Sequence, residues 1–287
     1  MNYTLNVNGR LMDLSHPQVM GILNCTPDSF YAASRMQTEK EIASRANLII
    51  MEGGTIIDVG AYSTRPGATP VDEEEEMKRL RFALTAVRRE QPDAVVSVDT
   101  FRPNVARMAV EEFGVGMIND VSGGNPAGAF GSTKSPEAQE KDVLDEEIPS
   151  IFRMVVQLGV PYILMSSASS VPDMMLAFAR QVQQLRSLGQ KDIILDPGFG
   201  FGKTMEQNYE VMGALDRLLV MELPLLVGVS RKSMLWKLLD SSPEESLHGT
   251  TALHTVALMK GASILRVHDV KVAVETVKVA CALGEKN

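Results

Sequence analysis

Residues 192–204 read DIILDPGFGFGKT, an apolar run that ends in an acid and continues into a glycine-rich turn. The last three residues match the end of a nucleotide phosphate loop, but Pro197 stands where that motif needs its first glycine. Proline has no backbone N–H and a fixed φ, so it cannot supply the first amide of a phosphate cradle. The stretch is therefore interpreted as a buried strand that ends in Asp196.

The same order, a short apolar run followed by an amphipathic stretch, recurs along the chain. Strands buried on both faces are continuously apolar, and eight strand–helix units predict a (β/α)8 TIM barrel. The alternative, a doubly wound open sheet, would more often carry a glycine fingerprint after its first strand, which is missing here. The predicted strands are 19–23, 55–59, 94–98, 115–118, 162–164, 193–195, 225–229 and 264–267, and the predicted helices are 38–52, 73–91, 103–112, 173–189, 205–220, 246–260 and 270–283.

Two segments fall outside this rhythm. Residues 3–14 alternate around Asn8-Gly9, a strong turn dipeptide, and predict a β-hairpin within residues 1–17 that covers one end of the body. Residues 125–150 are polar with scattered Pro and Gly, and predict a surface insertion between the fourth and fifth strands. We expect residues 1–287 to form a single domain.

The composition bounds the class of partner. The chain has 287 residues, 45% of them hydrophobic, and a net charge of -8. An acidic surface argues against nucleic-acid or membrane partners, although a local basic cleft can still bind an anionic small molecule. Cys25 and Cys281 have no metal-ligand spacing, and the first residues do not resemble a signal peptide. A cytoplasmic enzyme fits these features.

Polar side chains stand at the carboxyl ends of seven of the eight predicted strands. One such residue would be an ordinary turn former, but barrel enzymes carry their chemistry at this rim, so the set predicts an active site. Its members are Asn24, Asp58, Ser63-Thr64-Arg65, Asp99, Asn119-Asp120, Asp196, Ser230–Ser233, Arg266 and His268.

The residue types at the rim indicate two kinds of contact. Arg65, Arg266 and His268 are donors suited to phosphate oxygens. Neutral oxygens such as that of Asn24 suit Mg²⁺ that keeps its waters and shares a phosphate. The carboxylates and amide of Asp99, Asn119 and Asp196 can accept hydrogen bonds from an amino-substituted ring.

Seven blocks of the sequence together resemble the dihydropteroate synthase family. They cover the chain in order, apart from the hairpin and residues 125–150. The resemblance implies a (β/α)8 transferase of folate biosynthesis, a homodimer and a target of sulfonamides. Its substrates would be (7,8-dihydropterin-6-yl)methyl diphosphate and 4-aminobenzoate. The blocks are MGILNCTPDSF (20–30), STRPGA (63–68), SVDT (97–100), INDVSGG (118–124), DPGFGFGK (196–203), SRKS (230–233) and RVHDV (266–270).

The resemblance also implies a role for each matching position. Catalysis would rest on Asp99, Lys232, Arg266 and His268, with Asp99 near the cation that forms when diphosphate leaves. The pterin would be bound by Asp99, Asn119, Asp196 and Lys232, with Met165 packed against it. The diphosphate would be held by Thr64, Arg65, Arg266 and His268, and Mg²⁺ by Asn24. The aminobenzoate pocket would be shaped by Phe30, Pro66, Phe201 and Ser233.

Tyr62 and Ser166 depart from the family pattern, which commonly has Glu and His there, and put the surroundings of the rim in doubt. Two rival functions remain. A pterin-binding methyltransferase would not need Ser230–Ser233, Arg266 and His268, and a barrel that only binds pterin would be expected to lose Asn24, Arg65 or His268.

Other polar residues are expected to be structural or solvated. We interpret Asp58 as an acid that bonds to backbone amides, and Lys203 as a solvated lysine. Residues 73–76, all glutamate, are interpreted as a solvated helix start. His248 and His254 are interpreted as surface residues, and Cys25 as a small buried residue without a catalytic role.

Overall fold

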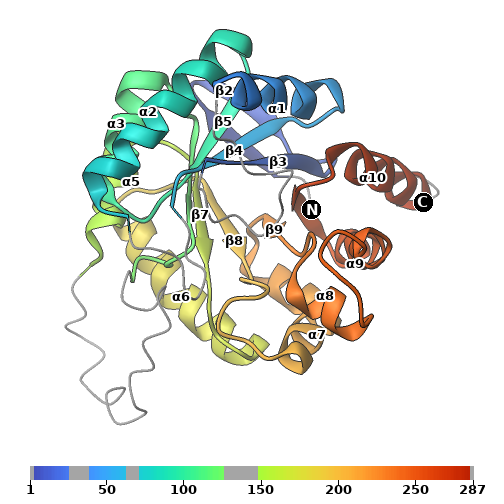
Figure 1. Ribbon diagram of the computed structural model, residues 1–287. Helices are drawn as coiled ribbons and strands as arrows, with labels where there is room; N and C mark the ends of the chain where they lie inside the picture. The colour runs from blue at the N-terminus through green and yellow to red at the C-terminus, as the bar shows by residue number, and fades with distance from the viewer. Residues whose placement is uncertain (1–2, 26–38, 63–70, 126–147, 285–287) are drawn as a thin grey trace.

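Eight parallel strands close into a barrel in which each strand pairs with the next and the last pairs with the first (Figure 1). The computed structural model describes residues 3–25, 39–62, 71–125 and 148–284. The closed barrel of parallel strands confirms the predicted TIM barrel. Its strands are β3 (Gln18–Asn24), β4 (Ile56–Gly60), β5 (Val95–Asp99), β6 (Met117–Asp120), β7 (Tyr162–Met165), β8 (Ile193–Asp196), β9 (Leu225–Val227) and β10 (Ala262–Val267).

Helices surround the strands (Figure 1), and the main core lies between the two layers. A Cβ on Gly21 of β3 would lie 2.6 Å from Cγ2 of Ile49, so glycine lets the first helix pack directly on the strand. The helices are α1 (Glu39–Met51), α2 (Glu73–Glu90), α3 (Pro103–Phe113), α5 (Ser150–Leu158), α6 (Val171–Ser187), α7 (Met205–Gly213), the 3-10 helix η3 (Leu215–Met221), α8 (Ser233–Leu238), α9 (Leu247–Met259) and α10 (Val270–Gly284).

The N-terminal hairpin closes one end of the barrel, as predicted. Strands β1 (Thr4–Val7) and β2 (Arg10–Asp13) pair antiparallel around Asn8-Gly9. Leu5, Val7 and Leu14 are buried in a second core with side chains from the barrel strands, including Met20 and Ile264. This cluster fills the N-terminal end of the barrel, which leaves the opposite end for polar residues.

Several elements differ from the predicted ones. Helix α5 was not predicted because it has only nine residues and follows a long polar segment. The helix predicted at 205–220 breaks at Ala214 into α7 and η3, and α8 is an additional short helix. The fourth strand runs over Met117–Asp120, later than predicted, so Asn119 lies within the strand. Residues 126–147 of the predicted insertion lie outside the described residues.

The hairpin contributes to stability through its buried side chains. Leu5 is 2% exposed, whereas Leu11 of the same hairpin is 78% exposed. We expect Leu5→Ala to lower the free energy of unfolding by about 2–5 kcal/mol, because it removes buried methyl groups and leaves a cavity. Leu11→Ala is the matched control and should change it by less than about 0.5 kcal/mol. Urea denaturation of both variants measures this, and equal effects would show that the hairpin is not part of the core.

Candidate active site

Arg266 lies at the centre of the polar rim and joins two carboxylates. Its Nε donates to Oδ2 of Asp58 at 2.7 Å, and its Nη2 donates to Oδ2 of Asp99 at 3.0 Å. Nδ2 of Asn119 donates to the same Asp58 oxygen at 3.2 Å. The side chains come from β10, β4, β5 and β6, whose parallel ends meet at this rim. Four of the residues that sequence placed there are therefore brought together.

The environment of Asp99 makes ionisation of its carboxyl group unfavourable. Burial raises the pKa of this carboxyl to about 7, with further increases from the negative charges of Asp58, Glu76 and Asp120. The guanidinium of Arg266 opposes that rise. Asp99 is thus a carboxylate that responds strongly to any change in charge at the rim.

Two buried oxygens of the site have no hydrogen-bond partner within the described part of the chain. They are Oδ1 of Asp58 and Oδ1 of Asn119. Buried polar atoms are normally paired, because leaving one unpaired costs about 1–3 kcal/mol. Donors on a bound molecule would satisfy them, so these atoms indicate a ligand with N–H groups.

Asp196, at the end of β8, faces two lysines. One oxygen accepts from the backbone N–H of Gly198 at 2.7 Å. Burial raises the pKa of Asp196, and the charges of Lys232, Arg266 and Lys203 oppose this. Burial also lowers the pKa of Lys232 to about 8. The ammonium of Lys232 donates to the backbone oxygen of Phe199 and lies 4.8 Å from the ring centre of Phe201.

The glycine-rich turn after β8 is held against β7. Gly198 has a φ of 64°, and a Cβ there would lie 2.3 Å from the backbone oxygen of Ser166. Nζ of Lys203 donates to the backbone oxygens of Ser166, Gly198 and Phe201 at 3.2, 3.0 and 3.2 Å. The prediction of a solvated Lys203 is therefore wrong, because the inward carbonyls of the turn need a donor.

Only some of the residues predicted to bind diphosphate lie among the described residues. His268 follows β10, and its backbone N–H donates to Oγ of Ser230 at 3.2 Å, with Nδ1 at 3.1 Å from the same oxygen. Ser233 begins α8 and Asn24 ends β3, both half-buried at the rim. Met165 ends β7 and is buried against the turn at Gly198. The predicted residues Phe30, Thr64, Arg65 and Pro66 lie outside the described residues.

Three further expectations are wrong. Asp58 bonds to the side chains of Arg266 and Asn119 rather than to backbone amides. Glu76 is fully buried instead of solvated. Its carboxylate accepts hydrogen bonds from Thr100 and Arg102, which offset the cost of burial. The third concerns His254.

His254 is 2% exposed instead of lying on the surface, and burial lowers its pKa to about 4. It shares the inward face of α9 with Thr250 and Ala257, four residues before it and three after it. That helical spacing was visible in the sequence and could have identified it. His248 is exposed, as predicted.

Tyr62 and Ser166 both have defined contacts. The ring of Tyr62 packs edge-on against Phe101, with the centroids 5.4 Å apart, and the guanidinium carbon of Arg102 lies 5.1 Å above it. Ser166 is buried, and its backbone N–H donates to the backbone oxygen of Asp196 at 2.9 Å. Both residues that depart from the family pattern are therefore packed into the rim.

Burial raises the pKa of Cys25 to about 12, which suits a residue with no nucleophilic role.

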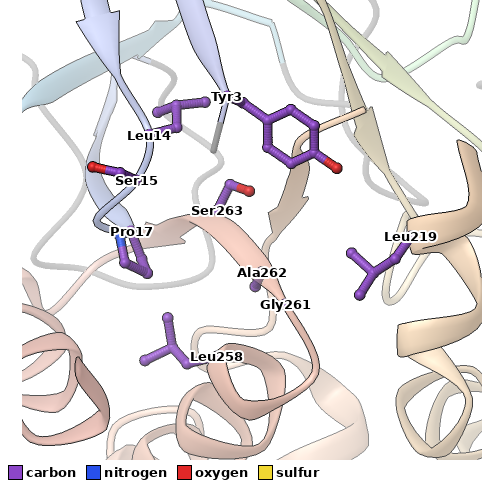
Figure 2. Close-up of a pocket in the computed structure, with 9 residues that line it drawn as sticks. All are labelled: Tyr3, Leu14, Ser15, Pro17, Leu219, Leu258, Gly261, Ala262 and Ser263. Atoms are coloured by element: carbon purple, nitrogen blue, oxygen red, sulfur yellow. The ribbon is translucent and has the colours of Figure 1, made fainter. Parts of the chain in front are cut away.

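A pocket of about 170 Å³ lies at the other end of the barrel, beside the hairpin. Figure 2 shows it between the chain around Leu14–Pro17 and the start of β10 at Ala262-Ser263. Its lining is mostly apolar and includes none of the predicted site residues.

Among the described residues, no helix combines the length and apolar character needed to cross a membrane.

The fold and the rim together define a TIM-barrel enzyme, and the unpartnered oxygens of the rim indicate a ligand with N–H donors. Comparisons with known proteins narrow this class. The family described as "Pterin binding enzyme" matches residues 20–268. The dihydropteroate synthase of Escherichia coli strain K12 is 38% identical over 96% of this chain and 94% of its own length. That of Bacillus subtilis strain 168 is 34% identical over 93% of this chain and 89% of its own.

Solved structures agree with the sequences. Xanthomonas albilineans dihydropteroate synthase with 4-aminobenzoic acid has a TM-score of 0.84 at 32% identity, and both chains are covered completely. The Yersinia pestis enzyme in complex with a sulfonamide drug has a TM-score of 0.85 at 34% identity, covering 99% of this chain and 100% of that one. A Coxiella burnetii dihydropteroate synthase with pteroic acid has a TM-score of 0.83 at 30% identity, covering 99% and 100%. The chain belongs to the dihydropteroate synthases of the pterin binding enzyme family.

The turn at Gly198 should be intolerant of any side chain. We expect Gly198→Ala to lower the free energy of unfolding by about 2 kcal/mol or more, because left-handed backbone alone costs alanine about 1–2 kcal/mol and the Cβ would also collide with the Ser166 carbonyl. Gly213→Ala is the control, since a Cβ at Gly213 meets nothing within 4 Å. Chemical denaturation measures both variants. A stability loss no larger for Gly198→Ala than for the control would contradict the close approach.

Proposed function

We propose that the rim around Arg266 carries out the dihydropteroate synthase reaction with the residues described here. This enzyme joins (7,8-dihydropterin-6-yl)methyl diphosphate to 4-aminobenzoate and releases 7,8-dihydropteroate and diphosphate. The observation that carries the assignment of roles is the shared guanidinium, which pairs with Asp58 and Asp99 beside the unpartnered oxygen of Asn119. It places opposite charges and free acceptors in one small volume.

The pterin is proposed to lie between β5, β6 and β8. Its N–H groups would be accepted by Asp99, by Oδ1 of Asn119 and by the oxygen of Asp196 that does not bind Gly198. Lys232 lies near Asp196, and Met165 is buried beside the turn, where it can pack on a flat ring. Phe201 and Ser233 are proposed to line the neighbouring place for 4-aminobenzoate.

The diphosphate is proposed to bind Arg266 and His268, together with Thr64 and Arg65. Oγ of Ser230 lies 3.1 Å from Nδ1 of His268 and helps to orient the ring, which is proposed to donate to a phosphate oxygen. Phe30 and Pro66 keep their proposed place in the aminobenzoate pocket.

Mg²⁺ is proposed as the cofactor, with Asn24 as its protein ligand. Within the described ranges, no three His, Cys, Asp or Glu side chains are arranged to hold a metal ion. A single amide oxygen fits Mg²⁺, because this ion commonly keeps its waters and is bound through substrate phosphates. When bound, it would neutralise charge on the departing diphosphate.

The reaction is proposed to be dissociative. The bond between the methylene carbon and the diphosphate oxygen breaks first, and its electron pair leaves with the diphosphate. The remaining cation is delocalised into the pterin and lies near the carboxylate of Asp99. The amine of 4-aminobenzoate then forms the C–N bond to that carbon and loses a proton to water. Arg266 and His268 neutralise the leaving group, so the chain acts by fixed charges rather than by a covalent intermediate.

We also propose that the protein works as a cytoplasmic homodimer in folate biosynthesis. The family resemblance supports this, and Cys25 is a free thiol, as in reduced compartments. Sulfonamides are proposed to compete with 4-aminobenzoate, supported by the Yersinia pestis complex. Light scattering of the purified protein would test the dimer, and inhibition kinetics would test the competition.

Turnover tests the proposed function. Purified protein with Mg²⁺ and both substrates should form dihydropteroate and diphosphate, and chelation of Mg²⁺ should reduce the rate. Asp99→Ala should lower kcat about a hundredfold, since losing one preorganised electrostatic partner typically costs about 3 kcal/mol. Asp93→Ala changes an exposed acid and should leave the rate unchanged. Tight pterin binding without turnover by the unmodified protein would instead favour a binding protein.

The pH profile should be a narrow bell. Asp99 has a pKa raised to about 7, so kcat/KM should rise as pH increases through that value and the carboxylate forms. Lys232 has a pKa lowered to about 8, so kcat/KM should fall as pH passes that value and the ammonium is lost. Lys232→Arg should move only the alkaline limb upward, since guanidinium stays charged. An alkaline limb that stays in place in this variant would exclude Lys232 as its source.

A further inference from the structure

Arg231 lies in the loop between β9 and α8, directly before Lys232, and its side chain binds two other segments of the chain. Nε donates to Oδ2 of Asp269 at 2.8 Å, and Nη2 donates to Oδ1 at 2.8 Å. Nη1 donates to the backbone oxygens of Pro243 and Glu244 at 2.9 and 2.7 Å. The Arg231 side chain is 6% exposed, and the hydrogen bonds it donates are charge-assisted.

The backbone of Arg231 is held in an unusual conformation. Its φ is 54°, in the left-handed region that favours glycine. Its N–H donates to Oγ1 of the buried Thr250 at 3.1 Å. A residue other than glycine stays in this region where its surroundings over-determine it, and such positions cluster at functional sites. The bidentate pair with Asp269 and the bond to Thr250 supply that constraint.

The residues on either side of the pair belong to the proposed site. Ser230 precedes Arg231 and meets the backbone and ring nitrogens of His268, which in turn precedes Asp269. Lys232 follows Arg231 and donates to the backbone oxygen of Phe199 in the turn after the neighbouring strand β8. One ion pair therefore locks the loop after β9 to the loop after β10, with a substrate-binding residue next to each partner.

We propose that Arg231 and Asp269 are positioning residues that set Lys232 and His268 in register with each other. The inference rests on the roles proposed above for Lys232 and His268. The guanidinium binds Asp269, Pro243 and Glu244, so it is proposed to act through the two neighbouring loops. A displacement of about 1 Å in a catalytic group can cost about a hundredfold in rate, so a rigid link between the loops matters for turnover.

The test begins with Arg231→Gly, which removes the guanidinium while glycine accepts the positive φ. We expect kcat/KM for the pterin diphosphate to fall about a hundredfold, as for a misplaced catalytic group, and ethylguanidinium to restore part of it. Asp269→Asn keeps the shape of the partner but weakens the pair, and should show a smaller loss in the same direction. Asp240→Gly is the matched control, because Asp240 is exposed and also has a positive φ of 46°.

A cycle with Lys232→Met separates positioning from general support of the fold. If Arg231 acts through its neighbours, Arg231→Gly should cost much less in the Lys232→Met background than in the unmodified protein. An equal loss in both backgrounds, matched by a lower melting temperature, would overturn the proposal, as would unchanged kinetics of Arg231→Gly. If Arg231→Gly does not fold, Asp269→Asn decides by the same comparison.

Calorimetry with inorganic diphosphate gives a second readout that does not need turnover. Arg231→Gly should bind it more weakly than the unmodified protein, because His268 is no longer aligned. Absence of turnover by the unmodified protein would refute the proposed function. Unchanged diphosphate affinity of Arg231→Gly would refute the positioning role, so the two failures can be told apart.

Discussion

The guanidinium of Arg266, shared between Asp58 and Asp99, is the interaction on which the mouth of this barrel depends. Asp58 is fully buried, and a buried carboxylate without a partner would be strongly destabilising. Arg266 offsets that cost, and it still has a nitrogen directed at Asp99. Because β4, β5 and β10 must be in register for these contacts, closure of the barrel and the electrostatics of the site are one constraint.

The other side of the mouth is organised by backbone groups. The turn after β8 brings Gly198 against the carbonyl of Ser166, and Lys203 binds three carbonyls of the same region. The backbone N–H of Gly198 also donates to the carboxylate of Asp196. Peptide groups thus hold Asp196 and Lys203 on one side of the mouth. On the other side, the guanidinium of Arg266 holds Asp58 and Asp99. Such preorganisation suits a reaction in which charge separates without a covalent intermediate.

Sequence predicted the barrel, the hairpin and the rim because each follows from local pattern. Asp99 and Asp196 end buried apolar runs, so their place in a barrel is fixed once the strands are recognised. The partners of Asp58 could not be predicted in this way, since Arg266 lies 208 positions away and bonding depends on side-chain reach across the barrel. Lys203 was misjudged because carbonyl directions in a glycine-rich turn are not encoded by residue type. His254 was misjudged although its helical spacing from Thr250 and Ala257 was readable.

The most direct measurement is the titration of Asp99 by carbon NMR in the unmodified protein, in Asp58→Asn and in Arg266→Met. We expect a pKa near 7 for Asp99 in the unmodified protein, because burial dominates. We expect a lower pKa in Asp58→Asn, which removes a neighbouring negative charge, and a higher one in Arg266→Met, which removes the compensating cation. An Asp99 that titrates like an exposed carboxyl, or that ignores both substitutions, would contradict the shared guanidinium as the organiser of the site.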